Sequence, residues 1–284
     1  MKKSLLAASA LALAVSAGSA LAADLPSKKA PMLMPPPPPP ALWTGFYVGL
    51  NAGYTWSDSS TTSIATSPVI PGALPAVLSA FGSGLLSTNN DGFIGGGQIG
   101  YNYQFANSFV AGIEADIQGV AGSNNAATSV SGVGGFSSTL SASRSLDYLG
   151  TVRGRLGYLI TPSLLVYGTG GLAYGQANLT TSVFQAAGAA VGTAAGSFSD
   201  TRVGWTAGGG VEWLFLPKWS AKVEYLYYDL GSVTTSSALT YNVAPGVIGT
   251  TQSSARFNGH VVRAGVNYHF NLFSPAAAPV VAKY

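Results

Sequence analysis

Residues 261–270, VVRAGVNYHF, alternate strictly between apolar and polar or small side chains. Successive residues of a β-strand point to opposite faces, so such a strand would have one apolar face and one polar face. The apolar face would end in two aromatic rings, and about ten residues is the length of a tilted strand that crosses a bilayer. A half-buried strand of a soluble β-sandwich would alternate in the same way. The apolar positions are Val262, Ala264, Val266, Tyr268 and Phe270, and the other face includes Arg263, Gly265, Asn267 and His269.

The composition decides between these two settings. Only 8% of the 284 residues are charged, against roughly 25% in a typical globular protein, and the chain contains 37 glycines. After residue 22 the sequence has no apolar run of the roughly 18 residues that a membrane-spanning helix requires. A membrane protein without such helices has to be a closed β-barrel, because open sheet edges are not tolerated in hydrocarbon. The sequence therefore favours a barrel.

Charge and cysteine content exclude several classes of function. Lys2 and Lys3 fall within the expected leader, so the remaining chain has 13 − 2 = 11 basic residues against 10 acidic ones, a net charge of +1. This balance gives no support for nucleic-acid binding. The chain has no cysteine, which excludes disulfides, thiolate metal sites and thiol nucleophiles.

The first 42 residues predict export followed by a tether. Residues 1–22 combine a basic start, a short apolar stretch and the small-x-small pattern Ala20-Leu21-Ala22, which is typical of a cleaved signal peptide; an uncleaved anchor is the alternative. Residues 23–42 contain six consecutive prolines, 35–40, which favour polyproline II and a semi-rigid periplasmic linker. A ligand for a proline-binding partner is the other interpretation of this run.

From residue 43 onwards, patterned segments alternate with breaks of two lengths. Three breaks, at 106–108, 161–163 and 216–218, are tight turns, whereas four others, at 57–91, 121–144, 177–201 and 231–256, are long and rich in Ser, Thr, Ala and Gly. Short turns at one end and long loops at the other are typical of an outer-membrane barrel. The eight predicted strands are Thr44–Trp56, Gly92–Phe105, Phe109–Val120, Ser145–Ile160, Leu164–Gln176, Arg202–Phe215, Trp219–Leu230 and Phe257–Phe270.

Alternation within these strands places eight charges on the inward face. They are Glu114, Asp116, Arg153, Arg155, Glu212, Lys222, Glu224 and Arg263. An eight-stranded barrel has an interior just wide enough for side chains to fill, and charges buried there have to be paired. We expect a self-neutralising lumen charge network that holds the barrel together. The alternative is a narrow charged channel whose ion pairs rearrange to pass ions or small solutes.

No catalytic or cofactor site can be nominated, so the sequence predicts a protein that is not an enzyme. The two histidines, His260 and His269, have no serine or carboxylate at a recognisable spacing, and we interpret His269 as a polar residue at the barrel rim. There is no His/Cys cluster for a metal. Residues 95–100 fit a dinucleotide-binding glycine pattern, but a strand rather than a helix follows. The aromatic residues near the strand ends, namely Trp43, Phe46, Tyr101, Tyr103, Phe105, Trp205, Trp213, Trp219 and Tyr268, are interpreted as interfacial girdles.

Several motifs together resemble one family. They are ADLP at 23–26, WTGFYVGLNAG at 43–53, GTVRGRLG at 150–157, VYGTGGLAYG at 166–175 and VRAGVNYHF at 262–270. They are similar to the RopB-type family, small porin-family or outer-membrane immunogenic proteins of Gram-negative bacteria. The resemblance implies an all-β fold, an eight-stranded antiparallel transmembrane barrel like the OmpA membrane domain, and it transfers no catalytic residue. Members of this family typically end at the aromatic residue of the last strand, whereas here a tail, 272–284, follows the barrel at 43–271, so Phe270 and Tyr284 are both candidates for the assembly signal.

These features predict an exported outer-membrane protein that needs no cofactor. We expect a structural and surface protein that supports envelope integrity, and the alternative is a weakly conducting porin for small polar solutes. The expected partners are outer-membrane lipid and the barrel assembly machinery. Host or phage surface factors are expected to meet the loops 57–91, 121–144, 177–201 and 231–256.

Overall fold

The computed structural model describes residues 42–69, 71–122, 126–243 and 246–270. The chain divides into two units, 1–39 and 40–284, and all of the described residues lie in the second. The predicted signal peptide, nearly all of the predicted linker and the tail 272–284 lie outside the described residues. No helix among the described residues is long and apolar enough to cross a membrane.

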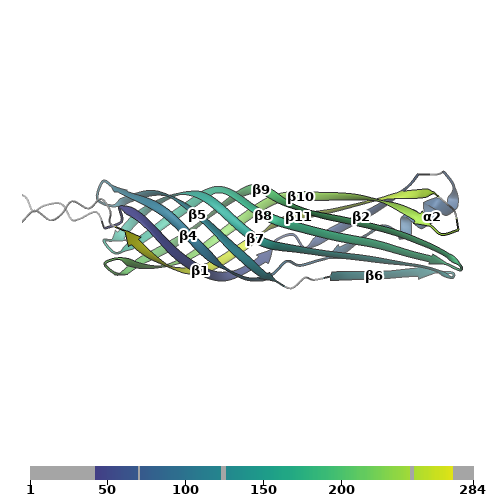
Figure 1. Cartoon of the computed structure of the whole chain (residues 1–284), viewed down its shortest axis with the longest axis horizontal. Coiled ribbons are helices and arrows are strands. Elements are labelled where there is room, and N and C mark those ends of the chain that lie inside the picture. The colour runs from purple at the N-terminus through teal and green to yellow at the C-terminus, as the bar shows by residue number, and fades with distance from the viewer. Residues whose placement is uncertain (1–41, 70, 123–125, 244–245, 271–284) are drawn as a thin grey trace, which may run out of the picture. The chain divides into compact units, whose positions relative to one another are not determined.

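Eight strands form a closed antiparallel ring in the order β1-β4-β5-β7-β8-β9-β10-β11, and β11 pairs back with β1 (Figure 1). This confirms the predicted eight-stranded barrel. The strands are β1 (Gly45–Ser57), β4 (Gly92–Phe105), β5 (Phe109–Gly122), β7 (Phe136–Thr161), β8 (Leu164–Ala187), β9 (Ala190–Leu216), β10 (Trp219–Tyr241) and β11 (Val247–Phe270). The three predicted turns follow β4, β7 and β9, and we call their end of the barrel the turn end.

The alternation of faces follows the sequence pattern. On β11, Val262 and Val266 are 42% and 43% exposed, while Val261 and Arg263 are at most 1% exposed. The same alternation on the other seven strands surrounds the barrel with an apolar outer belt. The faces of β8 could not be assigned from the sequence, because both carry apolar residues or glycine; the structure places Leu165 and Tyr167 inside and Val166 and Leu172 outside.

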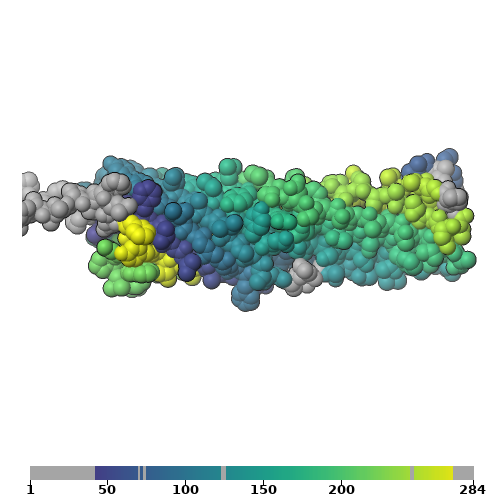
Figure 2. All heavy atoms as spheres, viewed as in Figure 1, coloured from purple at the N-terminus to yellow at the C-terminus, as the bar shows by residue number. Residues whose placement is uncertain are grey.

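The four segments predicted as long loops lie at the opposite end of the barrel and are mostly β-structure. They contain β2 (Thr61–Pro68), β3 (Gly84–Ser87), β6 (Ala126–Val133), helix α2 (Ala73–Phe81) and the outer halves of β7–β11. We call this part the extension. Its polar composition hid the strands from sequence analysis, since Ser, Thr, Ala and Gly give a weak alternation signal. In Figure 2 its surface continues that of the barrel.

The ladder pattern shows that the ring divides into two sheets in the extension. Sheet A has the order β6-β7-β8-β9, and sheet B has the order β10-β11-β2-β3. The β9–β10 ladder stops at Trp205 paired with Asp229 and resumes only at Thr193 paired with Thr240. No ladder joins β6 to β3 among the described residues.

An apolar core lies between the two sheets. Sheet A contributes Leu140, Ala142, Val183 and Ala194, sheet B contributes Ile64, Leu86, Leu239, Tyr241 and Ile248, and α2 contributes Leu78. Side chains of sheet A also hold α2 in place: Gln185 Nε2 donates to the Leu78 carbonyl at 2.7 Å and Ser138 Oγ donates to the Phe81 carbonyl at 2.8 Å. Two packed sheets with a capping helix give these segments a defined fold in place of the long loops expected from the sequence.

Charges mark the boundary between barrel and extension. Apart from the eight inward charges and Lys218 in a turn, every Asp, Glu, Lys and Arg among the described residues lies at this level. We call the set the charged ring: Asp58, Asp91, Arg144, Asp147, Asp200, Arg202, Asp229 and Arg256. On β10 the stretch from Trp219 to Asp229, between the turn end and the ring, has the length of about ten residues that a tilted strand needs to cross a bilayer.

Candidate functional site: the barrel lumen

The eight predicted inward charges come from five of the eight barrel strands, and β8, which lies between β7 and β9, supplies none. Residues two apart on one strand share a face, so β5, β7 and β10 each supply a pair, while β9 and β11 supply one charge each. The register places opposite charges directly across from one another: Glu114 faces Arg153, Glu224 faces Arg263 and Glu212 faces Lys222. Cross-strand pairing of opposite charge stabilises a sheet.

Two arginines, Arg153 and Arg263, form the centre of the network. Arg153 reaches Glu114 at 2.5 Å, Asp116 at 2.9 Å and Glu224 at 2.9 Å. Arg263 reaches Asp116 at 2.9 Å and Glu224 at 2.6 Å from the other side of the lumen. The planar guanidinium groups therefore join β5, β7, β10 and β11 across the barrel interior, a role that suits arginine better than lysine.

The remaining charges extend this centre towards the turn end. Lys222 Nζ donates to Glu114 at 2.8 Å, and Arg155 pairs with Glu212 at 2.6 Å. Arg155 also lies over the Tyr167 ring, 4.0 Å from its centroid, in a cation–π arrangement. The structure thus brings all eight residues into one connected set of ion pairs.

The network is both buried and electrically balanced. None of its eight side chains belongs to a residue more than 4% exposed, and four carboxylates meet four cations. Two charges taken out of water are tolerated only when they are paired and hydrogen-bonded, and the removal of one partner is strongly destabilising. The Glu114 carboxylate is an example of this pairing, because it accepts hydrogen bonds from Arg153, Lys222 and the Tyr47 hydroxyl.

Neutral side chains complete the network, and sequence analysis did not include them in it. Tyr47 donates to Glu114 at 2.7 Å and accepts from Arg155 at 3.0 Å. Asn267 donates to Glu212 at 2.7 Å. Both residues occupy inward positions, Tyr47 on β1 and Asn267 on β11, so the alternation could have revealed them. The sequence does not reveal that Gly100 makes room for the Tyr47 side chain. Any residue with a Cβ at position 100 would clash with the Tyr47 ring and hydroxyl.

Apolar layers close the lumen on both sides of the network. Towards the turn end lies a cluster of Trp43, Val110, Leu159, Leu165 and Tyr167. Towards the extension lies a larger cluster that includes Leu149, Leu226, Phe257 and Val261. Trp43 was interpreted as a girdle residue, and this is wrong: it is fully buried, and its indole N–H donates to the Pro162 carbonyl at 3.0 Å.

His269 is not the rim residue that the sequence suggested. It is 2% exposed, and its Nε2 lies 2.8 Å from Ser220 Oγ, which in turn donates to Glu212 at 2.5 Å. Serine, histidine and a carboxylate therefore do meet, but Ser220 is fully buried and open to no substrate. Among the described residues, no three His, Asp or Glu side chains are placed to hold a metal ion.

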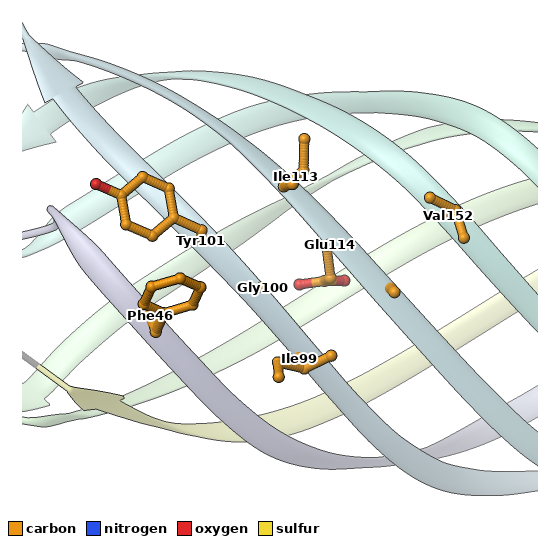
Figure 3. A pocket seen from close by; sticks show the side chains of 8 residues that line it. Phe46, Ile99, Gly100, Tyr101, Ile113, Glu114 and Val152 are labelled. Atoms are coloured by element: carbon orange, nitrogen blue, oxygen red, sulfur yellow. The ribbon is translucent and has the colours of Figure 1, made fainter.

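The outer face carries two further features. A pocket of about 180 Å³ opens in the apolar belt between Phe46 and Val152, where the Phe46 and Tyr101 rings meet at 4.8 Å (Figure 3). Its walls are apolar, as expected of a surface that faces lipid.

Beside the charged ring, the His260 ring stacks on the Trp56 ring with 5.5 Å between the ring centroids, and the Nδ1 atom of His260 lies 2.7 Å from the Tyr225 hydroxyl.

Comparison with known proteins shows the family. Residues 7–270 match the family described as outer membrane protein beta-barrel domain. The chain is 35% identical to a 31 kDa outer-membrane immunogenic protein of Brucella melitensis over 90% of this chain and 96% of that one. It is 28% identical to a 25 kDa outer-membrane immunogenic protein of Brucella abortus over 94% and 98% of the two chains.

Among solved structures, the outer membrane protein OprG from Pseudomonas aeruginosa is similar at 12% identity and a TM-score of 0.40, with 80% of this chain and 97% of that chain covered. A likeness at that level carries no conclusion about function. The match over nearly the whole barrel and the relatives in Brucella, together with the closed ring of strands, show that this chain belongs to the family of outer-membrane β-barrel proteins and resides in the outer membrane.

Proposed function

We propose that this protein is a structural and surface protein of the outer membrane, a closed barrel that carries a folded module outside the cell. The observation that supports this most directly is the lumen. Its charges are fully paired and buried, and apolar layers lie on both sides of them. A barrel with such an interior anchors and orients what it carries, and does not pass solutes.

The extension is the part that would meet the surroundings. Two sheets and a capping helix hold a defined surface beyond the charged ring. We propose that this surface, over 57–91, 121–144, 177–201 and 231–256, provides the contacts with host or phage factors, while the outer belt contacts lipid. The assembly machinery would be a transient partner during insertion. The names of the Brucella relatives describe immunogenic proteins, and an ordered exposed module suits recognition by antibodies.

The rival function is a weakly conducting porin, and single-channel recording separates the two. The refolded protein is inserted in a planar bilayer, and its different gel mobility before and after boiling serves as the control for folding. We expect no discrete current steps. Steps from well-folded protein whose ion selectivity changes in Glu114→Gln would overturn the proposal, because the network would then line a conducting path.

A further inference from the structure

The extension contains one strand whose edge is left open. Strand β6 pairs with β7 on one side only, from Ala126 opposite Ser143 to Val133 opposite Phe136. Its other edge has no ladder among the described residues. All residues of β6 except Ala127 are exposed, including Val130 at 70% and Val133 at 65%. Figure 1 shows β6 at the lower edge of the extension; strand β3 comes near it there but, within the described part of the chain, forms no ladder with it.

This edge has none of the features that usually protect a free strand. Natural sheets block their edges with lysine, proline, bulges or an inward charge. The β6 sequence AATSVSGV has no charge and no proline, and its ladder with β7 runs without a register shift. The tight turn to β7 is formed by Gly134 and Gly135, with φ of 58° and 81°, so the hairpin is well defined. An ordered, unprotected edge is a template for another strand.

The charge distribution identifies the partner as a second copy of this chain. When two identical strands pair antiparallel, a charge near the two-fold axis lies against its own copy and repels it. Here the segments 59–90, 117–143, 177–199 and 230–255 contain no Asp, Glu, Lys, Arg or His at all. The extension can therefore approach its own copy without electrostatic repulsion, and it offers a charged or ion-pairing partner nothing to bind.

The direction of β6 determines how two copies can pair. β5 rises from the turn end, so β6, which follows it in the chain, runs away from the membrane. Two copies in one membrane hold their β6 strands in the same direction, whereas copies in two facing membranes hold them in opposite directions. Antiparallel pairing, which is slightly more stable per residue than parallel pairing, is therefore available only between facing membranes.

We propose that the free edge of β6 pairs antiparallel with β6 of a second copy on an apposed outer membrane, so that the protein links cell to cell. This inference rests on the proposed surface role of the extension and names its partner. The backbone groups of β6 would supply the bonds of an intermolecular ladder, and the exposed Val130 and Val133 would be covered in it.

The test uses the full-length protein in two populations of vesicles that carry different fluorophores. We expect vesicles with protein in both populations to tether, and vesicles with protein in only one population to stay apart. Val130→Lys should reduce tethering to the background. The matched control is Ser182→Lys, an equally new charge at an exposed position of β8, whose strand is paired on both sides. Gel mobility before and after boiling verifies that both variants fold.

Because the chain has no cysteine, one introduced thiol reports the contact directly. With Val130→Cys in vesicles whose proteins bear two different tags, oxidation should link differently tagged chains, while Ser182→Cys should not. Failure of wild-type protein to tether, tethering that survives Val130→Lys, or cross-links only between chains of one vesicle would each overturn the inference. Conductance is measured on the same preparations, so a failure of the closed-barrel function is seen independently of tethering.

Discussion

Replacement of Arg153 by methionine tests whether the lumen network holds the barrel together. The side chain is 1% exposed and binds three carboxylates, Glu114, Asp116 and Glu224, within 2.9 Å. Methionine fills much of the same volume but leaves one negative charge in excess inside the barrel. Removal of one partner from a buried ion pair typically costs about 3–5 kcal/mol, so we expect Arg153→Met to lower the free energy of unfolding by about that amount.

The double variant Arg153→Met with Glu224→Gln restores the charge balance of the lumen. It should therefore be more stable than the sum of the two single variants predicts, with a coupling of about 1–3 kcal/mol. The measurement is the urea dependence of folding in lipid vesicles, followed by tryptophan fluorescence and gel mobility. If the single variant costs less than about 1 kcal/mol, or if the two effects add without coupling, Arg153 does not belong to a tightly coupled network.

Three other changes probe the belt, the lumen closure and the extension. Val266→Arg places a charge at a lipid-facing position of β11 and should cost about 2–4 kcal/mol in the same urea assay, and a neutral result would contradict the assigned face. Trp43→Ala should cost about 3–5 kcal/mol without opening a conducting path, because the network and the upper apolar layer remain; current steps would contradict this. Burial raises the pKa of Tyr241 from 10.0 to about 12, so folding favours the protonated phenol. Its contribution should be complete below pH 10 and lost as the pH rises towards 12; the urea midpoint for unfolding of the extension should fall over that range, and Tyr241→Phe should remove this part of the pH dependence.

The barrel could be predicted from the sequence because the membrane imposes a strict pattern on it. Lipid outside and a polar interior require alternation at every residue, and the eight inward charges followed from that rule before any contact was known. Their exact pairing did not follow, since Arg153 meets Glu224 across the lumen, 71 residues away in the chain. Burial of Trp43 was also hidden, because a residue just before the first strand has no alternation to place it.

The extension could not be predicted, because water imposes no comparable pattern. The strands of the extension face solvent on one side and a thin apolar core on the other, and Ser and Thr occur on both faces. Thr181, for example, is 3% exposed because it lies on the inner face of sheet A. Segments rich in Ser and Thr without a clear alternation are therefore predicted as loops when only one sequence is considered. The helix α2 was missed for a different reason: it is short and flanked by proline and glycine, signals that favour a turn.

The point at which the β9–β10 ladder ends has a physical cause that can be tested. Within lipid every backbone N–H and C=O needs a partner, so the ring has to be continuous up to the charged ring, and it is. Beyond the ring water can satisfy these groups, and the ladder stops there, at Trp205 and Asp229. The amides of 194–204 and 230–239 that point across this seam should therefore exchange with deuterium much faster than those of 205–213 that point towards β10. Equal protection on both sides of Trp205 would mean that the seam is closed, and the extension would then be a continued barrel rather than two sheets.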